Sequence, residues 1–222
     1  ISANESYAKG HDLEISEELY TKSHNLLEKI LCGKKSLTRQ EIAEHFNRSG
    51  IVAWAKMAEK TAEKPVWVHF GAGNIFRGFI AGLQQRLLNA GLAESGIVAA
   101  ETFDYDIIDK IYVPHDSMTL MVSLKADGST QKEVIASIAK GIKANCADEA
   151  QWQQLTDVFT APSLQMASFT ITEKGYALRN MKGELMPVVV SDMENGPKQA
   201  HHAMAVVAAM LYARYQAGAM PI

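Results

Sequence analysis

The sequence predicts an α/β fold, in which helices cover both faces of a doubly wound parallel sheet. The short β-prone run 66–70 ends abruptly at Gly71. Apolar residues at helical spacing begin directly after this turn, and a second apolar run follows at 96–100. Strands that alternate with helices along the chain are typical of parallel sheets covered by helices.

The turn after the first expected strand carries the sequence Gly71-Ala-Gly-Asn-Ile-Phe-Arg77. Gly71 allows a sharp turn, and Gly73, which lacks a Cβ, allows backbone N–H groups to approach a pyrophosphate. The N-terminus of the following helix adds unpaired donors and about half a positive charge. Strand, glycine turn and helix in this order predict a Rossmann-like dinucleotide-binding unit.

The glycine motif departs from the common G-x-G-x-x-G pattern. Its third glycine is replaced by Phe76, and Gly78 comes two residues later. Gly78 and Gly82 lie four residues apart on the expected helix 74–89, so we expect them to allow close packing against the sheet. A βα turn without a ligand is the alternative. A Walker phosphate loop is excluded, because Phe79 and Ile80 stand where lysine and serine or threonine are required.

An acidic residue, Glu101, follows the second expected strand. A carboxylate at this place commonly accepts the adenosine ribose hydroxyls and repels a 2′-phosphate, which favours NAD over NADP. Glu101 lies 30 residues after Gly71, whereas about 20 is usual. Asp104 is a competing candidate, and a third alternative is that neither carboxylate binds the ribose.

The middle of the chain predicts a short helix at 105–112 and a β-hairpin insertion. The runs 118–124 and 133–138 flank Asp127-Gly128, a dipeptide typical of tight hairpin turns. A further helix is expected at 148–159.

The strand expected at 163–172 ends in Thr172 and Glu173. Ligands of open α/β sheets bind at such strand ends, although a turn without a ligand is equally compatible with these two residues. The last helix is expected to start at Asn195 as N-cap, with Pro197 in its first turn and a continuation to Gly218.

Residues 1–63 predict a helical N-terminal extension, and Pro65 marks the boundary to a dinucleotide-binding domain over 64–222. No catalytic constellation stands out in the extension. His24 and His45 are interpreted as surface or half-buried helix residues. The adjacent His201 and His202 lack the i,i+4 spacing of a helical metal pair, so no metal site is expected.

The composition is that of an ordinary globular protein, with 47% hydrophobic and 21% charged residues among 222. A net charge of −3 argues against a nucleic-acid-binding surface that covers the whole molecule.

Cys32 and Cys146 are interpreted as reduced thiols. The N-terminus shows no signal peptide, and the longest apolar run, 203–213, is too short to cross a bilayer. We therefore expect a cytoplasmic protein that binds no membrane.

Three segments resemble the mannitol dehydrogenase family, the polyol-specific long-chain dehydrogenases and reductases. They are 69–78 (HFGAGNIFRG), 101–109 (ETFDYDIID) and 170–176 (TITEKGY). The family includes mannitol dehydrogenase, mannitol-1-phosphate dehydrogenase and the fructuronate and tagaturonate reductases. The resemblance extends over about 65–222.

The resemblance implies an NAD site and assigns residues to it. Glu101 would bind the ribose hydroxyls, and Thr172 and Glu173 would border the nicotinamide half. The pyrophosphate would be held by Gly71, Ala72, Gly73, Asn74, Ile75, Phe76 and Arg77.

The catalytic lysine of the family does not carry over. It belongs to a K-x-x-x-x-N-x-x-H motif in a C-terminal helical domain. Here only Lys140 has an asparagine five residues later, Asn145, and Asp148 stands in place of the histidine. The family's S-x-D-N segment is missing too. No catalytic residue is therefore expected in this chain, and we expect the C-terminal catalytic domain to be absent from it.

Two functions follow as expectations. The first is the cofactor-binding half of an NAD-dependent oxidoreductase that moves a hydride between NAD(H) and a sugar alcohol, or a related sugar acid, and its keto form. The alternative is a non-catalytic nucleotide-binding module that turns nothing over in this form.

Overall fold

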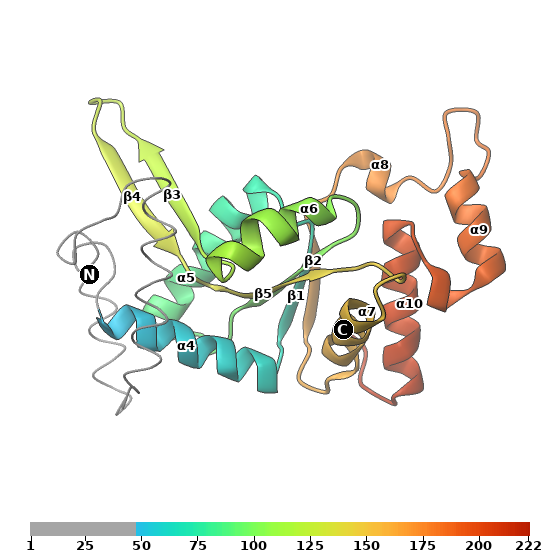
Figure 1. Ribbon diagram of the computed structural model, residues 1–222, viewed down its shortest axis with the longest axis horizontal. Helices are drawn as coiled ribbons and strands as arrows, with labels where there is room; N and C mark the ends of the chain where they lie inside the picture. Colours follow the sequence, from blue (N-terminus) through green and yellow to red (C-terminus); the bar gives the residue numbers. More distant parts are fainter. Residues whose placement is uncertain (1–47) are drawn as a thin grey trace.

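The computed structural model describes residues 48–222, with side chains from residue 54 onward (Figure 1). The helices expected before residue 48, with Cys32, His24 and His45, lie outside the described residues. The elements follow one another as α4 (Arg48–Glu63), β1 (Trp67–Phe70), η1 (Phe76–Ile80), α5 (Ala81–Asn89), β2 (Ile97–Glu101), α6 (Tyr105–Ile107), η2 (Ile108–Tyr112), η3 (Val113–His115), β3 (Thr119–Leu124), β4 (Thr130–Ile135), β5 (Ile138–Lys143), α7 (Glu149–Thr160), β6 (Met166–Phe169), α8 (Glu173–Tyr176), α9 (Pro187–Asn195), η4 (Pro197–Gln199) and α10 (Ala203–Gln216).

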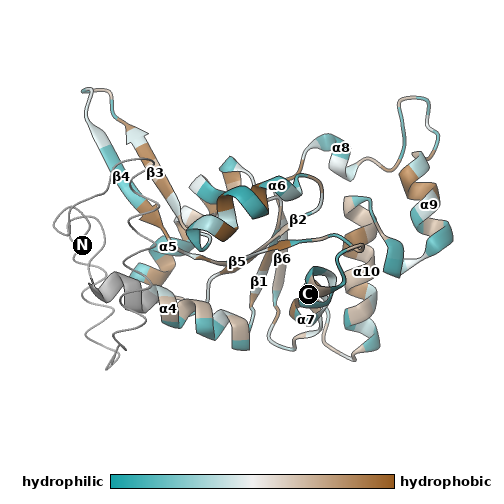
Figure 2. Ribbon diagram, viewed as in Figure 1, coloured by the Kyte–Doolittle hydropathy of each residue, from teal (hydrophilic) through white to brown (hydrophobic). Residues whose placement is uncertain are grey.

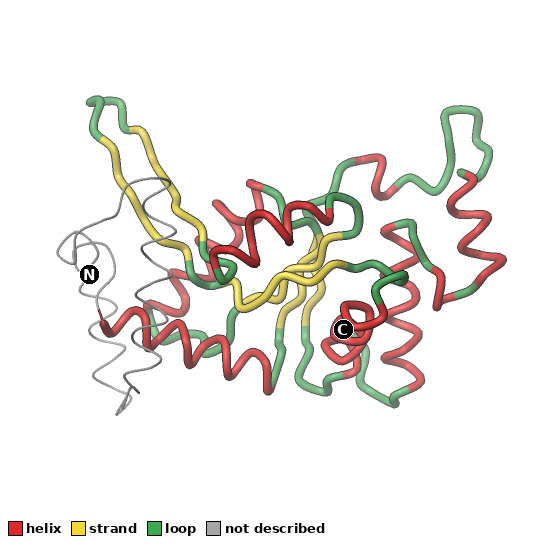
Figure 3. The backbone as a smooth tube through the Cα atoms, viewed as in Figure 1, coloured by secondary structure: helices red, strands yellow, loops and turns green. Residues whose placement is uncertain are grey.

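A four-stranded parallel sheet forms the centre of the molecule, with the strand order β5-β2-β1-β6. In register, Val68 of β1 lies between Val98 of β2 and Ala167 of β6. The strands run through the middle of the fold, and helices lie around them (Figure 3). The predicted α/β fold with a parallel sheet is therefore confirmed.

Helices cover both faces of this sheet, because alternate residues of each strand point to opposite sides. On one face Val68 and Phe70 pack in a buried cluster with residues of α7 and α10. On the other face Ile97 and Ala99 pack with residues of η1, α5 and η2. The colouring of Figure 2 shows much of β4 as hydrophilic, in keeping with the exposure of its first half. The sheet is doubly wound, as predicted.

The predicted β-hairpin is present, and it projects from the body of the molecule (Figure 1). Its second arm is displaced by three residues from the expected run 133–138, because β4 spans Thr130–Ile135. After two residues the chain enters β5, a strand of the main sheet that the sequence did not predict separately. Ile138 and Ile142 are fully buried there, so the apolar pattern assigned to the hairpin in part belongs to the core.

The helix after β1 begins at Asn74 and is π-helical over η1 before it continues as α5. Phe76 is fully buried, and its ring stacks on that of His69, with centroids 4.1 Å apart and planes 7° from parallel. A phenylalanine therefore fills the space between strand and helix that a third glycine would close. A widened helical turn is a common place for such an insertion.

Gly78 and Gly82 do not face the sheet, contrary to the expectation. A Cβ at Gly78 would lie 2.7 Å from Cε of Met121, and one at Gly82 would lie 3.6 Å from Cδ1 of Ile135. Both neighbours belong to the hairpin strands, so these glycines allow the hairpin to pack on the helix.

Gly91 ends α5, as predicted. It has a φ of +69°, and the N–H of Leu92 donates to the carbonyl of Leu87 over 2.9 Å. This bond is typical of a glycine-terminated helix.

The prediction of one helix from Asn195 to Gly218 is wrong for the residues before Ala203. Asn195 ends α9, a helix that the sequence did not predict, and the chain then forms the short η4. The long helix α10 begins only at Ala203, and its N-cap is His202, whose Nδ1 accepts the N–H of Met204 over 3.2 Å.

The predicted helix 148–159 is confirmed as α7, and the strand expected at 163–172 is reduced to β6.

His69 makes the stability of the fold depend on pH. Its Nδ1 lies 2.7 Å from Oγ of Ser168 and its Nε2 2.9 Å from Oγ1 of Thr170. Burial lowers the pKa of His69 from 6.5 to about 4. Between these values the unfolded chain binds a proton that the folded protein excludes. Stability should therefore fall by roughly 3 kcal/mol as the pH decreases through this interval.

Urea unfolding at several pH values measures this effect. We expect His69→Asn, which removes the titrating ring, to lose less stability than wild type between neutral and mildly acidic pH. An equal loss in both proteins would contradict the assignment to His69.

Candidate functional site

A cavity of about 650 Å³ lies at the edge of the sheet where the parallel strands end. Gly71 and Gly73 line it from the turn after β1, Glu101 and Phe103 from the end of β2, and Thr172 from the end of β6. The carboxyl ends of parallel strands meet at one edge, where open α/β sheets bind their ligands.

Gly71 makes the turn possible. Its φ is +101°, a region that side-chain-bearing residues rarely adopt, and its N–H donates to the carbonyl of Ala100 over 2.9 Å. A Cβ on Gly71 would lie only 2.4 Å from the carbonyl oxygen of Thr170. The chain can therefore pass between β2 and β6 only with glycine at this position.

Gly73 faces open space instead. A Cβ built on it would meet no atom within 4 Å, and the residue lines the cavity. The helix that begins at Asn74 leaves its first N–H groups without carbonyl partners in the same helix. An anion could therefore approach the backbone here without obstruction, so the residues present fit a dinucleotide diphosphate.

Ala72 lies between the two glycines. Side chains from other elements form hydrogen bonds to both its backbone N–H and its backbone carbonyl. Its N–H donates to Oε2 of Glu101 over 2.9 Å. Its carbonyl accepts the hydroxyl of Tyr112 over 3.0 Å. Ala72 itself is fully buried. The position of the turn is thus set by β2 and η2 together, and not by its glycines alone.

Tyr112 remains a hydrogen-bond donor over the whole physiological range. Burial raises the pKa of its phenol, Arg77 counteracts the shift, and the negative charge of Glu101 adds to it. The sequence analysis did not identify Tyr112, which lies 40 residues after Ala72 in the chain.

Glu101 is 8% exposed, and its carboxylate is occupied by backbone donors. Besides the N–H of Ala72, it accepts the N–H of Thr102 over 2.9 Å and that of Phe103 over 3.0 Å, both at Oε1. The carboxylate lines the cavity but primarily supports the turn. Its role as a ribose acceptor stays a prediction. Asp104 is exposed and is not among the residues that line the cavity.

The other predicted residues lie in different settings. Asn74 and Ile75 are exposed at the start of the helix, and Arg77 donates to Oδ1 of Asn74. Phe76 is buried against His69 and does not line the cavity. Their contact with a cofactor stays a prediction.

Thr172 is exposed and lines the cavity, and its carbonyl accepts the N–H of Gly175 over 2.8 Å. Glu173 is exposed as the first residue of α8. The structure therefore brings Gly71, Gly73, Glu101 and Thr172 together around one space.

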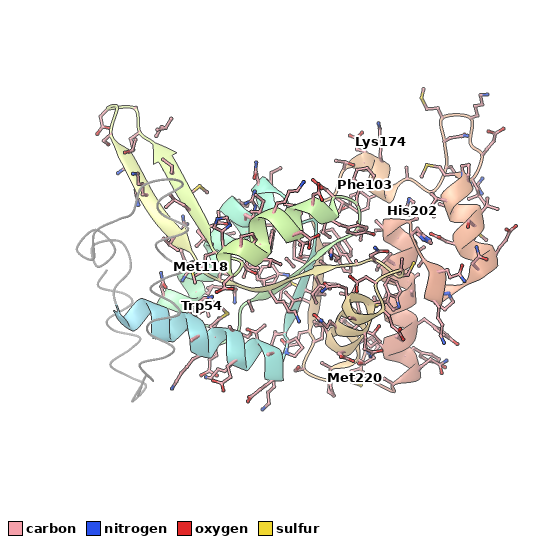
Figure 4. All side chains as sticks on the ribbon, viewed as in Figure 1. Trp54, Phe103, Met118, Lys174, His202 and Met220 are labelled. Atoms are coloured by element: carbon pink, nitrogen blue, oxygen red, sulfur yellow. The ribbon has the colours of Figure 1, made fainter. Side chains whose placement is uncertain are left out.

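Several residues of the cavity mouth were not predicted. Phe103, which is 92% exposed, comes from the loop after β2, Lys174 from α8, and His202 from the start of α10 (Figure 4). Their convergence depends on how α8 and α10 pack, which no local pattern shows. Within residues 48–222, no group of histidine, cysteine and acidic side chains could hold a metal ion.

Lys140, the partial match to the family's catalytic motif, lies elsewhere. It projects from β5 into a separate cavity of about 510 Å³ that Trp54 and Gln154 also line. Burial lowers the pKa of Lys140. This lysine is not among the residues that line the larger cavity.

Known proteins resemble this chain in sequence and in structure. The D-mannonate oxidoreductase of Thermotoga maritima is 46% identical over 167 residues, which are 75% of this chain and 31% of that protein. The solved structure of the Pseudomonas fluorescens mannitol 2-dehydrogenase ternary complex with NAD and D-mannitol superposes with a TM-score of 0.59 at 25% identity, covering 73% of this chain and 33% of that one. The chain belongs to the mannitol dehydrogenase family.

The altronate oxidoreductase of Halalkalibacterium halodurans is a third similar protein. It is 28% identical over 120 residues, which are 52% of this chain and 23% of that protein. The chain thus spans about a third or less of the length of these mannitol dehydrogenase relatives. No protein-family profile matches the sequence. Among the helices described, none is both long and apolar enough to span a membrane.

If the turn binds the cofactor, Gly73→Val should weaken that binding in this mannitol dehydrogenase family chain while preserving its fold. The valine side chain would enter the open space where a diphosphate would approach, but it would meet no protein atom on its Cβ. We expect NADH affinity, measured by fluorescence titration, to fall at least about tenfold, which corresponds to about 1.4 kcal/mol. Gly82→Ala is the matched control, because a methyl group there makes an ordinary contact away from the cavity. Unchanged affinity in Gly73→Val would show that the turn is merely structural.

Glu101→Gln should weaken the turn itself. An amide group cannot accept hydrogen bonds at both of its ends, so the N–H of Ala72 or those of Thr102 and Phe103 lose their acceptor. We expect a loss of about 1–2 kcal/mol in urea unfolding, together with weaker NADH binding. Asp104→Asn changes the neighbouring exposed carboxylate and should leave stability unchanged. Equal stability of Glu101→Gln and wild type would contradict the supporting role of this carboxylate.

Proposed function

We propose that this chain is the cofactor-binding part of an NAD-dependent oxidoreductase that acts on a polyol or an aldonate. The observation that carries the proposal is the open approach to Gly73 at the wall of the cavity, beside an Ala72 whose backbone is fixed on both sides. A rigid turn with free amides at a helix N-terminus is suited to bind a diphosphate.

The residues of this chain would bind and orient the cofactor. Gly73 and Asn74 would donate backbone N–H groups to the diphosphate, and Glu101 would hold the turn and border the ribose. Thr172 lines the same cavity as the turn and would border the nicotinamide half. NAD supplies the hydride acceptor when bound, and the protein contributes its position relative to the substrate.

The similarity to D-mannonate and altronate oxidoreductases favours a sugar acid as substrate. The general base that would take the hydroxyl proton is proposed to lie in a C-terminal helical domain of the longer protein. Residues 64–222 would form the NAD-binding domain, preceded by a helical extension at 1–63. We propose a cytoplasmic location, without nucleic acid or membrane as a partner.

A second function, a nucleotide-binding module without turnover, is favoured for these 222 residues taken alone. The chain spans about a third of the length of its relatives, and Lys140, the partial match to the catalytic motif, lies outside the cavity.

Titration with NADH and NADPH, followed by an assay with NAD and D-mannonate, tests both functions. We expect saturable NADH binding that is at least about tenfold tighter than NADPH binding, and no turnover by the isolated chain. Absence of NADH binding would contradict the proposed cofactor site. Turnover by the isolated chain would contradict the placement of the base in another domain.

A further inference from the structure

Three side chains form a chain of contacts beside the cofactor cavity that the proposed function does not use. The thiol of Cys146, in the loop after β5, lies 3.5 Å from Nε2 of His201. On the other side of the ring, Nδ1 of His201 lies 3.4 Å from Oδ1 of Asp192. A nucleophile, a histidine and a carboxylate in this order are the arrangement in which the carboxylate orients the ring and the ring takes the proton of the nucleophile.

Asp192 is held in place beside the ring by the backbone. It is 6% exposed, and its two oxygens accept the backbone N–H groups of His201 and His202 over 3.1 and 2.8 Å. The carboxylate on α9 is therefore fixed relative to the backbone that carries His201. The imidazole itself is exposed to solvent, with a side-chain exposure of 56%, and Cys146 is half-buried. A small reagent can reach the thiol.

The surroundings of Cys146 disfavour a resting thiolate. Burial and the negative charge of Asp192 raise the pKa of the thiol, whereas a backbone hydrogen bond lowers it. Tyr105 of α6 is a further titratable group near this thiol. At neutral pH the group is a thiol, so its reaction requires a base that removes the proton before the attack. Nε2 of His201 lies close enough to the sulfur to take this proton.

We propose that Cys146 is a thiol–disulfide exchange site, in which His201 acts as general base and Asp192 as the residue that positions it. The reaction partner is a low-molecular-weight disulfide such as glutathione disulfide. The thiol of Cys146 gives its proton to Nε2 of His201, and the thiolate so formed attacks one sulfur of that disulfide. A new S–S bond forms, the old one breaks, and the leaving thiolate takes up the proton. Cys146 is oxidised to the mixed disulfide, and the leaving half of the reagent is reduced to a thiol.

The site is coupled to the cofactor cavity through His201, which lines that cavity together with Gly71 and Gly73. A glutathionyl group on Cys146 occupies the space beside this imidazole. The mixed disulfide and the bound dinucleotide therefore compete, and this coupling rests on the proposed function. Exchange at Cys146 would make cofactor binding sensitive to the redox state of the thiol pool.

The base role is tested in a Cys32→Ser background, in which Cys146 is the remaining cysteine of the sequence. Mixed-disulfide formation with glutathione disulfide is followed by intact mass. At about pH 7.5 we expect His201→Gln to slow the reaction at least about tenfold, because glutamine cannot take the proton. At about pH 10.5 the thiolate forms without assistance, so the two rates should converge. His115→Gln, which alters a histidine of η3 that contacts Ile111 instead, should behave as wild type. Equal rates of His201→Gln and wild type at both pH values would overturn the proposal.

The coupling is tested separately. Saturating NADH should slow the exchange in the Cys32→Ser protein, and dithiothreitol should restore NADH binding to the mixed disulfide. If NADH binds but leaves the exchange rate unchanged, the coupling is refuted. If NADH does not bind at all, the proposed function fails, whereas the effect of His201→Gln still decides whether Cys146 is a base-assisted thiol.

Discussion

The two hydrogen bonds that fix the backbone of Ala72 are the constraint on which the rest of the site depends. One acceptor, the Glu101 carboxylate, comes from the end of β2, and one donor, the Tyr112 phenol, comes from η2. Gly71 adds a steric limit, since no Cβ fits against the carbonyl of Thr170. With the turn held from three sides, Gly73 is presented to the cavity in one position. If the turn binds a diphosphate as proposed, this preorganisation means that little conformational entropy would be lost on binding.

The same constraint accounts for the unusual glycine motif. A third glycine serves close packing of the helix on its strand, but here Phe76 stacks on His69 and the helix widens to a π-helical turn. His69 is in turn held by the hydroxyl groups of Ser168 on β6 and of Thr170 directly after it. The aromatic pair thus fastens the helix to two strands at once.

Local signals were sufficient to predict most elements, but not the contacts between them. The strand before Gly71, the helix after it and the Asp127-Gly128 hairpin each follow from short-range spacing. The strand β5 was not predicted, and only its first residue, Ile138, fell within the run assigned to the hairpin. Its identity as a strand depends on pairing with β2, which local spacing does not show. Glu101 was predicted as a ribose acceptor from its place after β2. That role stays a prediction, whereas the backbone N–H groups that Glu101 accepts could not be predicted, because no sequence pattern displays them. Tyr112 was missed for the same reason, since its partner is a carbonyl 40 residues away.

A crystal structure of the chain with bound NAD tests the central claim most directly. The account predicts the diphosphate over Gly73, with phosphate oxygens within hydrogen-bond distance of the N–H groups of Gly73 and Asn74, and the bonds of Ala72 to Glu101 and Tyr112 intact. Cofactor density in another part of the molecule, or a turn that abandons both bonds of Ala72 to admit the ligand, would contradict it.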